Sequence, residues 1–102
     1  MSFNLELTES ALEDIQEIKF YISTTLKNPE AAVSIVESIV STVEKLKIFP
    51  KVHRVRKTHL LHGEIRFVPV NNYTVLYSVN DDKSIVSVLR VVYGRRNISE
   101  II

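Results

Sequence analysis

Residues 73–93, YTVLYSVNDDKSIVSVLRVVY, have the pattern that most clearly indicates the architecture of the chain. The first part of this stretch alternates, and one face of the predicted strand collects the larger apolar side chains Tyr73, Val75, Tyr77 and Val79. Asn80-Asp81-Asp82 forms turns readily, and the strand predicted over 84–93 is apolar on both faces except at Ser87 and Arg90. The stretch therefore predicts two adjacent antiparallel strands, of which the second is central in a sheet.

Two more strands are predicted before this pair, over 53–57 and 64–68. Asn71-Asn72 supplies the turn into the next strand. Pro69 has no backbone N–H to donate, so it is expected at a strand end. The second half of the chain thus predicts four consecutive antiparallel strands.

The first half predicts one strand and two helices. The alternation of residues 3–7 predicts a half-buried strand. The helix that follows begins either at Thr8, a suitable N-cap, or at the capping box Ser10-Ala11-Leu12-Glu13. That helix has an apolar face formed by Ala11, Ile15, Ile18, Ile22 and Leu26, with Asp14 placed mostly off it. Asn28-Pro29-Glu30 begins a second helix, which Pro50 prevents from continuing beyond Phe49. The short link predicts an antiparallel helical hairpin.

The predicted fold class is a two-layer α+β domain, with an N-terminal strand and a helical hairpin packed on a mostly antiparallel sheet, in the order β-α-α-β-β-β-β. Its 102 residues predict a single domain spanning 1–102, and 45% hydrophobic and 25% charged residues are ordinary for a soluble protein. There is no cysteine, which excludes disulfides and thiolate chemistry. No signal peptide or membrane span is evident, so a cytoplasmic location is expected.

Charge is distributed unevenly along the chain. Residues 1–50 carry a net −4 and residues 51–102 a net +5, and the second half contains all six arginines. Arginine makes bidentate contacts with phosphates and carboxylates that lysine cannot reproduce. The basic second half predicts a surface that binds an anionic macromolecule. The alternative is a solvated sheet face whose positive charge is balanced by the negative charge of the helices.

The arginines fall into two groups of candidate binding residues. Arg54, Arg56 and Arg66 lie on neighbouring predicted strands, where they form either a basic patch or a charged edge that prevents aggregation. Arg90, Arg95 and Arg96 surround the end of the last strand, where Gly94 permits a sharp exit and adjacent guanidinium groups can clamp a phosphate or carboxylates. His53, His59 and His62 lack a convincing ligand geometry, so neither a metal nor any other cofactor is expected.

The whole chain resembles the RelE/ParE superfamily of bacterial type II toxins. The resemblance is carried, in order, by Ala11-Leu12-Glu13-Asp14-Ile15, Asn28-Pro29-Glu30-Ala31-Ala32, Leu46-Lys47-Ile48-Phe49-Pro50, Tyr73-Thr74-Val75-Leu76-Tyr77 and Val88-Leu89-Arg90-Val91-Val92-Tyr93-Gly94-Arg95-Arg96-Asn97. It implies the same fold, and a cognate acidic antitoxin that wraps and silences the toxin in a hetero-oligomer.

The resemblance implies one of two activities. ParE-like members poison DNA gyrase by binding it, whereas RelE-like members cut mRNA on the ribosome without a metal. If the chain is such a ribonuclease, the catalytic candidates are Arg66, Arg90, Tyr93, Arg95 and Arg96. Three positions depart from the RelE pattern: Glu64 replaces a lysine, Thr74 an arginine, and Ile101 or Ile102 the C-terminal tyrosine. The residues therefore favour the gyrase poison, with the ribonuclease, or a toxin fold that only binds a partner, as alternatives.

Overall fold

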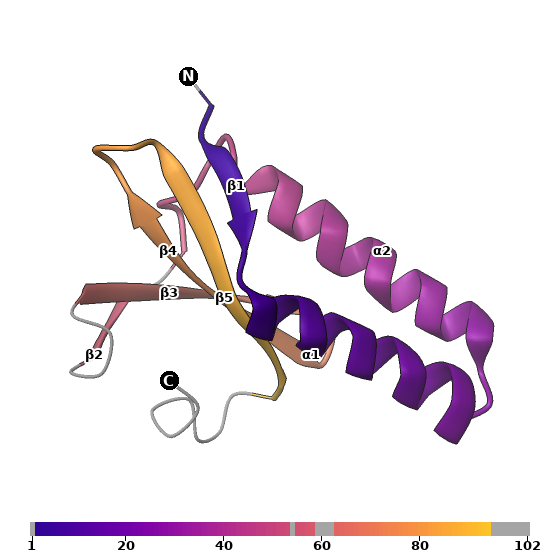
Figure 1. The fold of residues 1–102 in the computed structure, drawn as a ribbon. Coiled ribbons are helices and arrows are strands. Elements are labelled where there is room, and N and C mark those ends of the chain that lie inside the picture. The colour runs from indigo at the N-terminus through magenta and orange to yellow at the C-terminus, as the bar shows by residue number, and fades with distance from the viewer. Residues whose placement is uncertain (1, 54, 59–62, 95–102) are drawn as a thin grey trace.

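Five strands and two helices form two layers in the computed structural model, which describes residues 2–53, 55–58 and 63–94 (Figure 1). In chain order they are β1 (Asn4–Leu7), α1 (Glu9–Phe20), α2 (Pro29–Lys45), β2 (Val55–Thr58), β3 (Gly63–Val70), β4 (Tyr73–Asn80) and β5 (Ile85–Tyr93). A π-helical turn, η1 (Tyr21–Thr25), extends α1. The predicted α+β class and the order of elements are confirmed.

Both helices begin at the residues that the sequence indicated. The Thr8 hydroxyl accepts from the backbone N–H of Ala11, and the Asn28 side chain accepts from that of Ala31. Pro29 is the first residue of α2, where its missing N–H does no harm. The helical hairpin closes at Lys27, which adopts a positive φ of 53°.

The first helix differs from the prediction at its end. The Ser23 hydroxyl donates to the carbonyl of Lys19 at 2.7 Å, and the backbone widens from an α-helix into the η1 turn. Leu26, predicted on the buried face, is consequently 55% exposed.

The strands form one sheet in the order β1-β5-β4-β3-β2. β1 runs parallel to β5, and every other pair is antiparallel, so β5 has a neighbour on each side as predicted. Pro69 lies one residue before the end of β3, where it pairs with Thr74 of β4. β2 pairs only with residues 63–66 of β3, so proline there interrupts no ladder on that side.

A β-bulge separates the two halves of the β4–β5 pair. Leu76 pairs with Arg90 but Tyr77 pairs with Val88, so Leu89 is an extra residue in β5. The extra residue lets Val88 and Val91 both join the core beneath the helices, although they are three positions apart. Simple alternation along 84–93 does not predict this change of face.

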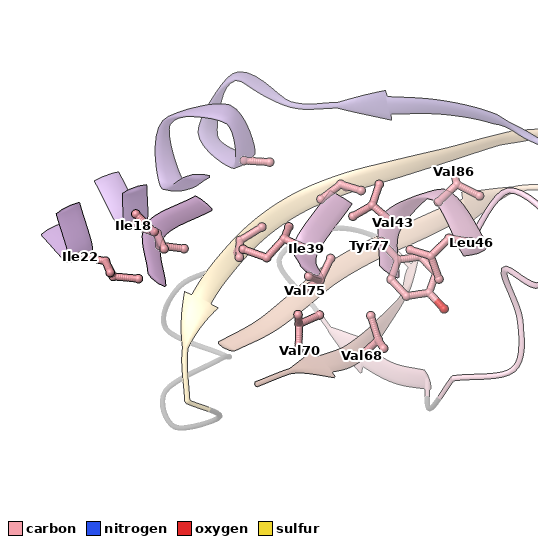
Figure 2. Close-up of a cluster of buried hydrophobic side chains, with 14 residues drawn as sticks. Ile18, Ile22, Ile39, Val43, Leu46, Val68, Val70, Val75, Tyr77 and Val86 are labelled. Atoms are coloured by element: carbon pink, nitrogen blue, oxygen red, sulfur yellow. The ribbon is translucent and has the colours of Figure 1, made fainter. Parts of the chain in front are cut away.

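The main core lies between the helical hairpin and one face of the sheet. Ile39 and Leu46 from α2 meet Val75 and Tyr77 from β4 there, and all four are buried (Figure 2). The opposite face of the sheet carries a smaller cluster, in which Ile65 and Leu76 are buried. Among the residues that the structure describes, no helix is long and apolar enough to cross a membrane.

Candidate functional site

The candidate site forms where α1 takes the place of a strand beside β5. β1 pairs with β5 only as far as Leu7 and Val88. Beyond that point Thr8 donates its backbone N–H to the carbonyl of Val88 at 3.0 Å and its hydroxyl to the carbonyl of Leu89 at 2.9 Å. The same hydroxyl caps α1, so one side chain both begins the helix and fixes it to the sheet.

Asp14 completes this attachment further along α1. Its Oδ2 accepts from the backbone N–H of Val91 at 2.9 Å and from Nε of Arg90 at 2.7 Å. Its Oδ1 accepts from Nη2 of Arg90 at 2.9 Å, which makes the ion pair bidentate. The hydrogen bond to Asp14 raises the pKa of Arg90, and the charges of Asp14, Glu17 and Glu13 act in the same direction. The guanidinium of Arg90 is therefore held against α1.

Asp14, predicted mostly off the buried face of the helix, is only 9% exposed. The signal was present, because Asp14 lies three residues after Ala11 and four before Ile18, both of which are buried. A carboxylate at that spacing on an apolar face needs a partner in the folded protein. The partner, Arg90, comes from the other end of the chain.

Beside this ion pair lies a groove of about 860 Å³, which we call the α1–β5 groove. Its sides come from α1, η1, the first turns of α2, the start of β4 and the end of β5. The apolar side chains that line it are Ile18, Tyr21, Ile22, Leu26, Ala31, Ile35, Tyr73, Val91, Val92 and Tyr93. Asp14, Glu17, Asn72 and Arg90 are its polar lining. An open groove of this composition is suited to apolar side chains of a partner.

Three tyrosines meet at one end of this groove. The rings of Tyr73 and Tyr93 pack edge to face, with centroids 5.5 Å apart and planes at 79°. Burial raises the pKa of Tyr73, and the neighbouring Tyr93 and Tyr21 raise it further. Tyr21 and Tyr93 themselves are 51% and 64% exposed. Large aromatic side chains so placed are typical of protein-binding surfaces.

The two predicted arginines whose side chains the structure describes make separate contacts. Arg66 donates through Nη1 to the carbonyls of His53 at 2.8 Å and Lys51 at 3.2 Å, and so braces the segment between α2 and β2. Arg90 binds Asp14 on α1. Arg66 and Arg90 are thus engaged with different segments of the chain, and their part in binding a target stays a prediction.

The other candidate residues are placed only in part. Arg56 pairs in register with Ile65, and only its backbone is described. Arg54, His59, His62, Arg95 and Arg96 lie outside the described residues. Tyr93 lies at the rim of the α1–β5 groove. Within 2–53, 55–58 and 63–94, no group of three or more metal-binding side chains comes together.

Thr74, the position where a RelE-like arginine is expected, faces no solvent. It is 1% exposed, and its hydroxyl donates to the carbonyl of Gly94 at 2.6 Å. Gly94 has a φ of +73°, the conformation that its lack of a side chain permits. Thr74 thus fixes the backbone at the exit of β5 instead of offering a charge.

Tyr77 gives a stability prediction at high pH. Burial raises the pKa of Tyr77 to about 12, while Arg66 acts to lower it. Between pH 10 and 12 the unfolded chain loses a tyrosine proton that the folded chain keeps, so the free energy of unfolding falls as pH rises, by roughly 1.4 kcal/mol per pH unit. We expect Tyr77→Phe to remove this component when urea unfolding is measured across the window. Identical pH dependence in both proteins would contradict the assignment.

A family model described as "ParE toxin of type II toxin-antitoxin system, parDE" matches residues 5–98. Among proteins with curated descriptions, none matches the chain.

Solved structures share the fold at low sequence identity. A chain of the chromosomal ParDE toxin–antitoxin system from P. aeruginosa is 20% identical with a TM-score of 0.74, covering 92% of this chain and 98% of that one. A chain of the RelBE2 toxin–antitoxin complex from Mycobacterium tuberculosis is 19% identical with a TM-score of 0.67, covering 91% of this chain and 99% of that one. A chain of the archaeal RelE–RelB complex from Pyrococcus horikoshii is 17% identical with a TM-score of 0.64, covering 94% of this chain and 99% of that one.

Proposed function

This chain belongs to the family of ParE toxins of type II toxin–antitoxin systems, and we propose that it arrests growth by binding and poisoning DNA gyrase. A cognate antitoxin binds the toxin and silences it. The whole of residues 1–102 acts as one domain, in the cytoplasm where gyrase works. The toxin carries out no chemistry of its own in this scheme.

The observation that carries the choice of target is how the cationic side chains are used. Cleaving RNA through its 2′-hydroxyl requires a proton acceptor near that hydroxyl and cations aimed at the phosphate. Arg66 instead donates to two backbone carbonyls, and Arg90 is paired with Asp14. Thr74 supplies no charge and is buried. Within the described residues, these three positions support a binding function over the RelE-like ribonuclease.

The antitoxin is supported by the kind of protein that shares the fold. The structures from P. aeruginosa, M. tuberculosis and P. horikoshii are all of toxin–antitoxin systems. The chain also has a surface that suits a protein partner, because the α1–β5 groove is lined by apolar side chains and rimmed by exposed tyrosines. We propose a toxin–antitoxin hetero-oligomer as the resting state.

Inducing the toxin without its antitoxin tests the proposed target. We expect growth arrest with DNA breaks, and we expect the purified protein to inhibit DNA supercoiling by gyrase and to trap cleaved DNA. Transcripts in the same cells should stay intact. Rapid in-frame cleavage of mRNA with undamaged DNA would instead assign the ribonuclease. Normal growth on induction would assign a chain that only binds its partner.

Two exposed aromatic residues, one at the groove rim and one outside the groove, give a matched pair for this experiment. Tyr93→Ala removes a ring that is 64% exposed beside the groove, and Phe49→Ala removes one that is 61% exposed in the segment after α2. Both proteins should keep wild-type circular dichroism, because neither ring is in the core. A loss of gyrase inhibition in one of them alone maps the gyrase-binding surface to that part of the toxin.

A further inference from the structure

We propose that gyrase binds the toxin through an apolar surface in the segment after α2, formed by Ile48, Phe49 and Val52, and that an apolar pocket on gyrase receives these side chains. We call this the Phe49 surface. The inference rests on the proposed function for the identity of the target. It adds the part of the toxin that makes the contact and the chemistry by which the contact forms.

The folded chain leaves the three side chains mostly in water. Ile48 is 60%, Phe49 61% and Val52 68% exposed, although all three lie within five consecutive residues. A single exposed apolar side chain is normal on a protein surface, whereas several together mark a place where a partner removes them from water. Aromatic side chains are also enriched at the centres of protein interfaces.

The backbone of this segment is fixed to the sheet by hydrogen bonds. The hydroxyl of Tyr77 on β4 donates to the carbonyl of Pro50 at 2.6 Å. Nη1 of Arg66 on β3 donates to the carbonyls of Lys51 at 3.2 Å and His53 at 2.8 Å. A surface that is ordered before binding loses little conformational entropy when a partner arrives, so more of its contact energy contributes to affinity. The sheet therefore presents the Phe49 surface in an order that suits binding.

The charges around the Phe49 surface favour a protein over a nucleic acid as the occupant. Two of the three lysines in residues 45–52 are paired with carboxylates, Lys47 with Glu44 at 3.1 Å and Lys51 with Asp81 at 2.7 Å. Binding a polyanion such as DNA depends on cations that neutralise its phosphates. Because both of these cations already have anionic partners, the apolar area is what the surface offers. Its complement is an apolar pocket without a strong charge.

The Phe49 surface and the α1–β5 groove lie at opposite ends of α2 (Figure 1). Ala31 and Ile35, in the first turns of this helix, line the groove, whereas the Phe49 surface follows its last turn. A helix of 17 residues is roughly 25 Å long. None of the three side chains of the Phe49 surface is among the described residues that line the groove. The groove therefore stays available to the antitoxin, and the two surfaces can be tested separately.

Substitution of the aromatic ring tests the inference. The measurements are the inhibition of gyrase supercoiling by the purified full-length toxin and its dissociation constant for gyrase by biolayer interferometry. We expect Phe49→Ala to raise the inhibitory concentration and the dissociation constant at least about tenfold. Phe49→Leu should stay within about threefold of wild type, because it keeps most of the apolar volume. The dissociation constant of the wild-type toxin should change little between about 50 and 200 mM salt.

Two other exposed rings provide matched controls. Phe20→Ala removes a ring that is 65% exposed on α1, and Tyr93→Ala removes one that is 64% exposed at the groove rim. Both variants should inhibit gyrase within about twofold of wild type. Phe49→Ala itself should unfold in urea like the wild-type toxin, as exposed substitutions do. It should also bind the protein encoded by the neighbouring reading frame, the expected antitoxin, as tightly as wild type does.

Three results would overturn the inference and leave the proposed function standing. The first is Phe49→Ala that inhibits gyrase like wild type, or Phe20→Ala that fails equally. The second is weaker antitoxin binding by Phe49→Ala with unchanged inhibition, which would assign the surface to the antitoxin. The third is a wild-type dimer in light scattering that Phe49→Ala makes monomeric without loss of inhibition, which would assign the surface to a second copy of the chain.

Two results concern the target itself. Gyrase binding that weakens more than about tenfold over the same salt range and does not respond to Phe49→Ala would indicate contact with a polyanion, and the inference would be wrong. If the wild-type toxin does not inhibit gyrase at all, the proposed function is rejected, and the inference is rejected with it.

Discussion

Asp14→Ala is expected to lower the free energy of unfolding by about 2–4 kcal/mol. The change leaves the guanidinium of Arg90 without its bidentate partner and the backbone N–H of Val91 without an acceptor. A buried polar group left unpaired is far more costly than the net gain from its hydrogen bond. Because the Arg90 side chain is 31% exposed, water compensates part of the loss, and we expect the lower part of the range. Urea unfolding monitored by circular dichroism measures the effect.

The neighbouring carboxylate provides the control for this experiment. Glu13→Ala removes the same charge from an exposed position one residue away, and it should change the free energy of unfolding by less than about 0.5 kcal/mol. Replacing both members of the pair, as in Asp14→Leu with Arg90→Met, should recover part of the stability, since no charge is then left alone although the N–H of Val91 still lacks its acceptor. A loss below 1 kcal/mol in Asp14→Ala would show that the pair is unimportant for the fold.

Tyr77→Ala is expected to have the other large effect, a loss of about 3–5 kcal/mol. Tyr77 is fully buried between the sheet and α2, and it has the largest side chain among those with less than 2% exposure (Figure 2). Its hydroxyl also donates to the carbonyl of Pro50 at 2.6 Å, which ties β4 to the segment after α2. Removing the ring leaves a cavity and an unpaired carbonyl together.

Tyr77→Phe separates the two contributions. It keeps the ring and removes the hydroxyl, so the expected loss is only about 1 kcal/mol. The difference between the alanine and phenylalanine variants then measures the packing of the ring alone. Equal losses in the two variants would mean that the hydrogen bond to Pro50, and not the core contact, dominates at this position.

The two effects also bear on function in different ways. Asp14 lines the α1–β5 groove, and Thr8 remains as a second attachment of α1 to β5. Loss of Asp14 should therefore loosen α1 against β5 and weaken antitoxin binding together with stability. Tyr77 belongs to the core and does not line the groove. Its substitution should therefore reduce stability and leave the affinity of the remaining folded protein unchanged.

Local chemistry made most of the elements predictable from the sequence. Thr8 and Asn28 begin the two helices because their side chains accept from backbone groups three residues on. The alternation in 73–79 places Tyr73, Val75 and Tyr77 toward the helices, as observed. Each of these outcomes depends on neighbours within a few positions, which a sequence displays directly.

The candidate site was harder to predict, because its contacts join opposite ends of the chain. The arginines were identified as a group by composition, yet Arg66 binds the carbonyl of His53 and Arg90 binds Asp14. Tyr93 was singled out for possible catalysis, and the structure places it at the groove rim beside Tyr73. Composition identifies which side chains can bind an anion, but it does not show which of them the fold has already engaged.

The helical hairpin, the run of antiparallel strands and their order could all be predicted from the sequence, because helix caps, turns and hydrophobic periodicity depend on nearby residues. The ion pair of Asp14 with Arg90, 76 positions away, follows only from the packing of α1 against β5. This ion pair requires that β1 ends at Leu7 and that α1 then runs along the edge of β5 that β1 no longer covers. It also requires the extra residue Leu89, which changes the pairing register of β5 by one residue. Each is a long-range packing outcome, and together they place the groove beside this ion pair.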